Sequence, residues 1–412
     1  MDQPAPSLTA NAANRAPLAF AEFVALAASM MALTALGIDS MLPALPAIGA
    51  GLDVAEPNHR QYVITAFLIG FAFAQLAYGP LSDRYGRRPV LVIALLSYAL
   101  TSALAALSGS FTLLLIARAA MGASAAGARV VTVALVRDCF AGRAMARVMS
   151  LTMIVFMAAP VIAPAFGWAI LKVGSWRLIF WGIAAAGLMI LGWFWLRMPE
   201  TLASDARQPL NLRRILGDYR LVLSDRNSVG YTLGSTAVSG ALFGFIGSVP
   251  QIMDEVFRQL DLLTPVFFCV AGMMALGAFL NSRIVMRFGM RLLSHSALTV
   301  LTLIAAAHLV VAWTGFESVW TFALLQALMM GCFGLVGANF SAMAMEKMGS
   351  IAGTASSLQG FVQTLGGALG GAAIGQAFNG TTVPLYTGFV VMGLVSLTIV
   401  AITERGRLFR PS

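Results

Sequence analysis

The sequence predicts an all-α membrane protein made of two pseudo-symmetric six-helix bundles around a central cavity. The chain of 412 residues is 59% hydrophobic and only 10% charged, whereas a soluble domain carries about 25% charged residues. Twelve apolar runs are each long enough to cross a bilayer, which takes about 20 helical residues. A polar segment after the sixth run, together with a repeated arginine–glycine motif, divides the chain into two halves.

The twelve predicted spans are joined by short polar connections. They cover residues 18–43, 60–80, 89–108, 112–136, 145–171, 176–197, 229–252, 263–283, 292–313, 319–344, 351–378 and 384–403. We therefore expect five units along the chain. They are a tail at 1–17, a first bundle at 18–197, a linker at 198–228, a second bundle at 229–403 and a tail at 404–412.

The basic residues are distributed unevenly over the connections. Twenty of the 26 Lys and Arg residues fall in the two tails, in every second loop or at the span ends that flank these loops. Four lie in or beside the alternate loops, and the other two, Arg118 and Arg129, lie well inside spans. Because loops rich in Lys and Arg remain in the cytoplasm, this bias places both termini there. The even number of spans independently predicts termini on the same side.

The most specific pattern lies between the second and third spans. Its fixed positions are Gly79, Asp83, Arg84, Gly86, Arg87 and Arg88. The surrounding runs are almost entirely apolar, so the charges predict a tight cytoplasmic turn. The arrangement Arg-x-Gly-x-Arg recurs 203 residues later at Arg287, Gly289 and Arg291, with Met286 in the place of Asp83. The two halves are therefore expected to be repeats of one another.

This loop resembles the signature of the major facilitator superfamily of secondary transporters. The resemblance implies parallel repeats of six helices, with the substrate site near the membrane midplane between the halves. It also implies that Asp83 and Arg87 act as a latch that holds the two halves closed on the cytoplasmic side.

Asp39 is the one acidic residue well inside a predicted span. A charge at the bilayer centre costs at least a few kcal/mol, so an ionisable residue there is a functional candidate. A carboxyl in a low-dielectric cavity can bind and release a proton near neutral pH, as proton-coupled transport requires. The alternative is that Asp39 lies at the membrane surface and is simply hydrated. Glu22, near the cytoplasmic start of the same span, is expected to reach water.

Arg118 is the second candidate for proton coupling. Together with Gly122 it resembles the second motif of the superfamily, an arginine four residues before a glycine. An arginine keeps its proton and needs a partner or water. Asp39 is the only acid expected at that depth, so we expect an Asp39–Arg118 couple, direct or through water. The alternative is a purely structural pair between helices.

Arg129 lies eleven residues after Arg118 on the same predicted helix. Eleven residues return the helix to within about 20° of the same face, about 16 Å further along the axis. Turned inward, Arg129 would make the cavity positive and attract an anionic or carbonyl-rich substrate. Alternatively its side chain extends to the cytoplasmic surface.

The fifth span contains Pro160, Pro164 and Gly167. This segment resembles the antiporter motif of drug exporters, in which proline and small residues bend the helix and allow close packing. Ala159 stands where that motif has glycine, so the match is partial. Prolines in membrane helices are also common without such a role.

Aromatic and amide side chains within the spans are candidates to line the cavity. With Asp39 and Arg129 they form the expected substrate site, and they are Tyr62, Tyr231, Phe243, Asn339 and Gln363. For each of them, packing between helices is the alternative role.

Several segments together resemble the Bcr/CflA branch of drug:proton antiporters. They are 39–46, 79–88, 136–138, 338–341 and 353–357. The resemblance implies a monomer in the bacterial inner membrane that exports lipophilic drugs in exchange for protons, with Asp39 carrying the proton and Arg118 assisting. The alternative is a proton-coupled importer of a nutrient or organic anion on the same fold.

Other functional classes receive no support from the sequence. We expect no enzyme, because no nucleophile–base set appears. The three cysteines, Cys139, Cys269 and Cys332, are scattered and predict neither a metal site nor a disulfide framework. The expected partners are a small drug, protons and membrane lipid, without nucleic acid. No cofactor is expected, since the proton gradient would supply the energy.

Overall fold

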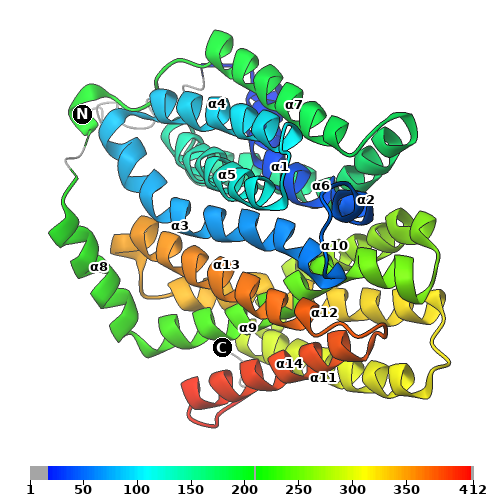
Figure 1. The fold of residues 1–412 in the computed structure, drawn as a ribbon. Coiled ribbons are helices and arrows are strands. Elements are labelled where there is room, and N and C mark those ends of the chain that lie inside the picture. The colour runs from blue at the N-terminus through cyan, green and yellow to red at the C-terminus, as the bar shows by residue number, and fades with distance from the viewer. Residues whose placement is uncertain (1–16, 208–209, 410–412) are drawn as a thin grey trace, which may run out of the picture.

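The computed structural model describes residues 17–207 and 210–409, so most of the tail at 1–17 and the end of the tail at 404–412 lie outside it. Twelve helices of 20 residues or more dominate the described chain (Figure 1). They are α1 (Phe20–Asp39), α3 (Tyr62–Tyr85), α4 (Arg87–Ala106), α5 (Phe111–Cys139), α6 (Gly142–Val173), α7 (Arg177–Arg197), α9 (Arg226–Gln251), α10 (Leu263–Phe288), α11 (Met290–Thr314), α12 (Val319–Met345), α13 (Ala352–Gln376) and α14 (Val383–Thr403). Each overlaps one predicted span.

Ten of the long helices are sufficiently long and apolar to cross a membrane, judged on the described residues alone. The other two are α6 and α13. Some side chains of α6 are outside the described set, and the glycines, serines and glutamines of α13 lower its hydropathy. The chain is therefore an all-helical, multi-pass membrane protein, as its composition predicts.

Helix α1 breaks immediately after Asp39. In a continuous helix the N–H of residue 43 would donate to the carbonyl of Asp39, but Pro43 has no N–H and its ring clashes with that carbonyl. The chain instead makes a turn and a short 3₁₀ segment, Leu42–Ala44, and re-enters a helix as α2 (Leu45–Gly51). The predicted first span, 18–43, thus continues to residue 51 with a break inside it.

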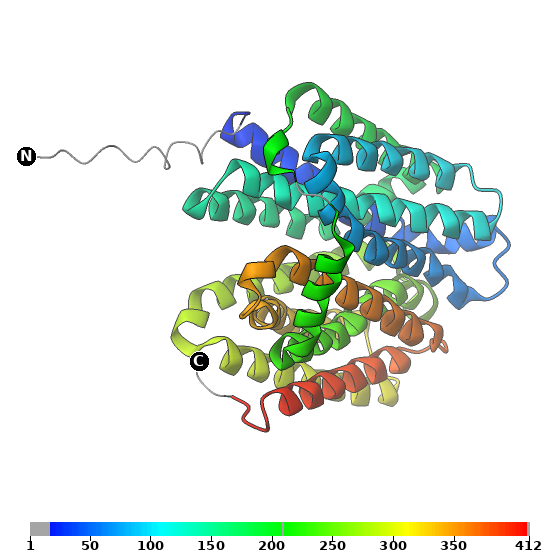
Figure 2. The same cartoon turned by 90° about the vertical axis from the view of Figure 1, so that its left-hand side faces the viewer.

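The repeated arginine–glycine motif forms the same turn in both halves. Gly86, between α3 and α4, has φ of 100°, and Gly289, between α10 and α11, has φ of 80°. Residues that have a Cβ atom rarely adopt a positive φ, which explains the glycine at both places. The sequence repeat is therefore a structural repeat, and the two bundles are arranged one beside the other in Figure 2.

A glutamate secures each of these turns. Glu200 accepts hydrogen bonds from the backbone N–H groups of Arg87 at 2.9 Å and Arg88 at 3.2 Å. In the second half Glu404 accepts from the Tyr231 hydroxyl at 2.6 Å and from Arg291 Nε at 2.9 Å. Burial opposes ionisation of Glu404, but these two hydrogen bonds outweigh it and hold its pKa below the usual value.

Helices α3 and α5 pack with their backbones in direct contact. A Cβ atom added at Gly122 would lie 1.9 Å from the carbonyl oxygen of Phe67, and one added at Gly70 would lie 1.9 Å from that of Ala119. Small residues allow membrane helices to approach this closely. Gly122, the glycine of the second motif, is therefore needed for packing.

We name the two ends of the bundle by what they carry. The basic end contains the turns at Gly86 and Gly289, and the α2 end is opposite. Midway along α3, Phe73 meets Phe361 of α13 edge to face, with ring centroids 5.3 Å apart. Among the described residues, all hydrogen bonds between the helices of the first half and those of the second lie at the α2 end. The halves are thus joined asymmetrically.

Four amide side chains form most of this closure, which we call the polar seal: Asn58, Gln61, Gln251 and Gln376. Gln61 Nε2 donates to Gln251 Oε1 at 3.0 Å and to the carbonyl of Gly375 at 3.2 Å. Asn58 Nδ2 donates to the carbonyl of Gln376 at 3.1 Å, and Gln376 Nε2 donates back to the carbonyl of Asn58 at 2.8 Å. Gln61 and Gln251 are buried. The seal therefore closes the α2 end with hydrogen bonds that an opening motion would have to break.

The α3–α5 contact leads to a first prediction. Replacing Gly122 with alanine forces apart two backbones that have no room to move, and overpacking of this kind typically costs about 1–3 kcal/mol. We expect Gly122→Ala to lower the thermal unfolding temperature of the purified protein and its yield. The matched control is Gly192→Ala on α7, where a Cβ meets nothing within 4 Å. Equal melting temperatures for the two variants would contradict the proposed packing role.

The polar seal leads to a second prediction. Gln61→Ala leaves the amide of Gln251 with one partner fewer in a buried setting, a loss of about 1–3 kcal/mol. We expect the α2 end to open more often. The measurement is the rate at which a membrane-impermeant maleimide, added from the α2 side, labels Thr65→Cys in a Cys269→Ser background.

Arg60→Ala is the comparison variant for this experiment. It removes an ion pair with Glu255 at 3.0 Å in which the glutamate is well exposed to solvent, and such pairs contribute little. We expect a smaller acceleration than with Gln61→Ala. A labelling rate in Gln61→Ala equal to that of the parent would show that the seal does not hold this end shut.

Candidate functional site

Asp39 is enclosed where α1 ends. Its side chain is 4% exposed and has no hydrogen-bonding or ionic partner among the described residues. A Cβ atom at Gly167 of α6 would lie 1.7 Å from the carbonyl oxygen of Ser40, so α6 touches the backbone directly beside Asp39. The Ser40 hydroxyl is also buried without a partner. The expectation of a buried acid is met, and the alternative of a hydrated surface position does not fit this burial.

Arg118 holds the end of α1 from the other side. Its guanidinium is fully buried and donates to two backbone carbonyls, from Nη1 to Gly37 at 2.7 Å and from Nε to Val63 at 3.0 Å. It also lies 4.6 Å above the ring of Phe67, a favourable cation–π contact. Nη2 is buried without a partner.

The expected direct couple between Asp39 and Arg118 is not formed in this conformation. No ion pair joins them within the described part of the chain, because the guanidinium is already committed to carbonyls of α1 and α3. Gly37, which accepts one of these bonds, precedes Asp39 by two residues. Arg118 therefore positions the segment that bears the acid.

Arg129 lies on the same side of α5 but in a different environment. Arg118 is fully buried, whereas Arg129 is exposed. Its guanidinium lies 5.8 Å from the ring centroid of Phe71 on α3. Around Arg118, α1 and α3 cover this face of α5. Around Arg129, further toward the basic end, the same face is open. This part of α5 therefore carries a solvent-accessible cationic group.

The proline segment lies within α6. Pro160 and Pro164 both belong to this helix, which continues without interruption from Gly142 to Val173. Pro164 is buried, and the side chain of Pro160 is outside the described set. Gly167 makes the backbone contact at Ser40 described above. Of the three predicted positions, Gly167 is the one that the structure brings to Asp39.

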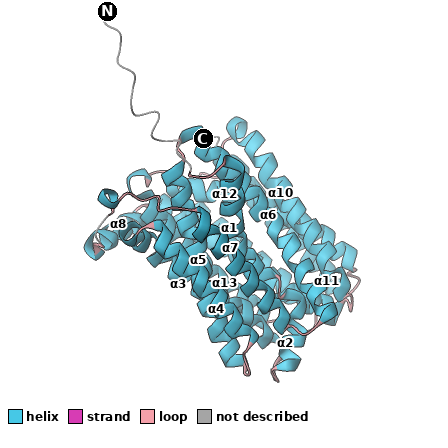
Figure 3. Cartoon of the chain, turned by 90° about the horizontal axis from the view of Figure 1, so that it is seen from above, coloured by secondary structure: helices cyan, strands magenta, loops and turns pink. Residues whose placement is uncertain are grey.

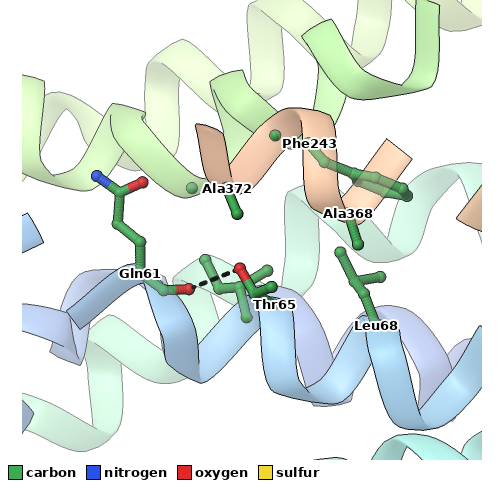
Figure 4. Close-up of a pocket in the computed structure, with 9 residues that line it drawn as sticks. Gln61, Thr65, Leu68, Phe243, Ala368 and Ala372 are labelled. Atoms are coloured by element: carbon green, nitrogen blue, oxygen red, sulfur yellow. Dashed lines mark hydrogen bonds between the residues drawn. The ribbon is translucent and has the colours of Figure 1, made fainter. Parts of the chain in front are cut away.

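A small pocket with a cavity volume of about 10 Å³, close to the size of one water molecule, lies between the halves, just inside the polar seal (Figure 4). Its walls come from α3, α9, α13 and the 3₁₀ turn that precedes α3, and they are Gln61, Ile64, Thr65, Leu68, Phe243, Gly247, Ala368, Gly371 and Ala372. Thr65 Oγ1 donates to the carbonyl of Gln61 at 3.4 Å, the bond drawn in the figure. The predicted candidate Phe243 therefore faces the space between the two halves.

Two other cavity candidates, Tyr62 and Gln363, do not line this pocket. Tyr62 is half-buried and stacks on His59 with centroids 5.2 Å apart. Gln363 donates to Ser239 Oγ at 3.0 Å, a bond between α13 and α9 within the second half. Both stay near the interface between the halves, because α3 and α13 pack against each other along it.

Tyr231 and Asn339 lie inside the second bundle, away from the pocket. Tyr231 is fully buried, and its hydroxyl is used by Glu404. Asn339 exchanges hydrogen bonds with Asn281, the shorter at 2.8 Å. The polar groups of both side chains are used in contacts between packed helices, which is the alternative role that the sequence allows for them.

The charged loop between α3 and α4 is organised around Arg87. Its guanidinium donates to Asp83 at 2.5 Å, Ser82 at 2.8 Å and Asp138 at 2.9 Å. All three partners belong to the first half. The expected latch between the halves is therefore absent from this conformation as far as the described residues go, and the motif instead ties α3, α4 and α5 together.

The other positions of the loop have local roles. Gly86 lies against the carboxylate of Glu200, which a Cβ would approach to 2.3 Å. Arg88 donates to the carbonyl of Trp195 at 2.9 Å, and Arg84 is exposed. Gly79 faces α13, where a Cβ would lie 3.8 Å from Ser357 Oγ. Gly79 is the loop position closest to the second half.

The structure contains two polar clusters that the sequence does not predict. One is the polar seal, whose members look like ordinary helix-end amides in sequence. The other joins His308 and Glu317, whose side-chain atoms Nε2 and Oε1 are 2.5 Å apart. His308 also stacks on Tyr386 at 3.5 Å between centroids. Glu317 lies nine residues after His308, in the loop between α11 and α12, and this short spacing is the signal that the sequence offers. Whether the two side chains meet depends on how α11 packs against α14.

This arrangement offers a buried carboxyl, an exposed cation and a pocket between two halves that are bonded at one end only. None of these groups forms a nucleophile–base pair. The chemistry available is binding and release of a proton and a solute.

Comparison with known proteins agrees with the fold. The Major Facilitator Superfamily model matches residues 19–371. Over 378 residues the chain is 30% identical to a "Bicyclomycin resistance protein homolog" of Haemophilus influenzae, covering 89% of this chain and 91% of that protein. It is 27% identical to "Multidrug resistance protein D" of Escherichia coli, covering 79% and 81%. The xylose transporter XylE from E. coli, in a partially occluded inward-open conformation, superposes with a TM-score of 0.73 at 14% identity, covering 92% and 96%.

The family model spans most of the chain, and the relative from H. influenzae aligns over nearly all of both sequences. The chain therefore belongs to the Major Facilitator Superfamily, and it is a transport protein rather than an enzyme.

Proposed function

We propose that this protein exports small lipophilic drugs in exchange for protons across the bacterial inner membrane. In this proposal it works as a monomer, both termini lie in the cytoplasm, and the proton gradient is the only energy source. The basic end then faces the cytoplasm and the α2 end faces the periplasm. The names of the relatives, a bicyclomycin resistance protein homolog and a multidrug resistance protein, support the drug class.

The observation that carries the proposal is the enclosure of Asp39. An unpaired acid in a membrane-spanning segment is costly, and such residues mark ion and proton pathways. Asp39 is 4% exposed and has no polar partner among the residues that the structure describes, and two motif residues, Arg118 and Gly167, contact the backbone on either side of it. A carboxyl that served only for packing would be satisfied by a neighbour.

The cycle we propose is alternating access. With the polar seal intact, the cytoplasmic side admits the drug, and Asp39 loses its proton to that side. The carboxylate then accepts a hydrogen bond from Nη2 of Arg118, which is buried and has no partner among the described residues in the present conformation. Opening of the seal exposes Asp39 to the periplasm, where protonation ends this interaction and the drug leaves.

Arg129 favours a second candidate function on the same fold, the proton-coupled import of a nutrient or organic anion. It is an exposed cation on a membrane-spanning helix, next to the aromatic ring of Phe71. A positive group there would attract a carboxylate or another anionic group. The direction of transport separates the two candidates.

The test of the proposal is neutralisation of Asp39. We expect wild-type protein to protect an efflux-deficient host against some members of a panel of neutral, cationic and anionic antibiotics. Asp39→Asn cannot exchange a proton, so its susceptibility should match that of the host with an empty vector. Drug-driven proton movement in proteoliposomes, followed with a pH-sensitive dye, should disappear in the same variant.

The matched control is Glu22→Gln, which neutralises the other acid of α1. Glu22 accepts hydrogen bonds from Arg197 at 2.8 and 2.9 Å in the first turn of α1, far from Asp39, so its neutralisation should leave resistance intact. Full resistance from well-expressed Asp39→Asn would refute proton coupling through this residue. No resistance from wild type, combined with uptake of organic anions that Arg129→Gln abolishes, would establish the second candidate instead.

A further inference from the structure

Helix α8 (Leu212–Ser224), in the linker between the halves, carries a surface that the transport cycle does not use. In Figures 1 and 2 it runs across the direction of the membrane-spanning helices, and Figure 3 places it at the edge of the bundle. Only one residue separates its end, Ser224, from the start of α9 at Arg226. The helix is therefore oriented along the membrane plane, close to the surface at the basic end.

One side of α8 is fixed to the second half. Val222 is 4% exposed and packs with Met348 and Ala355 near the basic ends of α12 and α13. Asp218 accepts a hydrogen bond from Thr354 at 3.4 Å. These contacts determine which face of α8 is left uncovered.

One edge of the uncovered face is apolar. Leu216 is 65% exposed and Leu223 is 60% exposed. Seven residues separate them, so they lie two turns apart on one edge of the helix. This edge continues the apolar surface of Val222 around the helix. Leucines so exposed in a helix that faced only water would have no stabilising contact.

Arginines border the same edge. Arg213 and Arg220 are exposed and are also seven residues apart, on the polar side of the two leucines. A helix with an apolar stripe bordered by cations binds in the interface of a bilayer, with its apolar side in the headgroup–acyl boundary. The cations attract anionic headgroups of the adjoining leaflet.

We propose that α8 is a lipid-binding helix. Leu216 and Leu223 enter the boundary between headgroups and acyl chains at the basic end, and Arg213 and Arg220 bind the phosphates of anionic lipids. The occupant is the membrane surface, because the positive charge of the edge complements anionic headgroups and α8 leads within one residue into a membrane-spanning helix. Anionic lipid would thereby hold the linker against the second half.

The experiment reports the position of α8 directly and requires no transported substrate. In full-length protein with Cys269→Ser, an environment-sensitive fluorophore is attached at Leu216→Cys, Leu223→Cys or Leu221→Cys. Leu221 is a matched control, since it is 52% exposed but lies on the opposite side of the helix. The variants are placed in nanodiscs of phosphatidylcholine alone or mixed with phosphatidylglycerol.

We expect blue-shifted emission and quenching by lipid-attached nitroxide at positions 216 and 223 in the mixed nanodiscs, with quenching by aqueous iodide at position 221. The shift at 216 should weaken in phosphatidylcholine alone and in Arg213→Gln/Arg220→Gln, but not in Arg214→Gln on the other side. Equal iodide quenching at all three positions in mixed nanodiscs would overturn the proposal. A shift at 216 that ignores both lipid charge and the two arginines would overturn the role assigned to anionic lipid.

Discussion

The break in α1 at Asp39 is the constraint on which the rest of the site depends. A helix interrupted inside a membrane leaves backbone carbonyls that lipid cannot satisfy, so the protein itself has to cover the break. Arg118 donates to the carbonyl of Gly37 on one side, and the backbone of α6 closes over Ser40 at Gly167 on the other. The same enclosure keeps Asp39 away from water without giving it a partner. Motif residues on two helices, α5 and α6, thus stabilise one short segment of chain.

The interface between the halves is bonded at one end and merely packed at the other. Hydrogen bonds between buried amides are directional, so the polar seal opposes separation at the α2 end. Toward the basic end no hydrogen bond joins the helices of the two halves among the described residues, and midway along α3 the halves meet through the packing of Phe73 on Phe361. The internal network around Arg87 makes the first half rigid where it meets the loop, as the cluster of Glu404 does in the second. The cycle proposed above would move each bundle as a unit about the α3–α13 contact.

Much of this architecture could be predicted because its signals are local. Apolar runs of about 20 residues identify spans, and the 203-residue repeat places equivalent turns at Gly86 and Gly289, whose positive φ angles explain the conserved spacing within this chain. The burial of Asp39 also followed from its position in a span. Partners were much harder to predict, since they join residues far apart in sequence. Arg118 was expected to pair with Asp39, directly or through water, and its hydrogen bonds to protein carbonyls are with Gly37 and Val63, while the hydrogen bonds of Arg87 are within the first half.

The sequence by itself determined that the chain is helical, crosses a membrane many times, repeats its turn motif and carries one acid inside a span. Composition and local spacing suffice for this, because the bilayer allows few alternatives to a helix. Only the tertiary structure decided which polar groups meet. Four features depend on how whole helices are placed against one another. They are the polar seal, the pocket beside Phe243, the use of Tyr231 and Asn339 in helix packing, and the uncovered edge of α8. Side-chain pairing across helices is settled by that placement, and a one-dimensional pattern does not contain it.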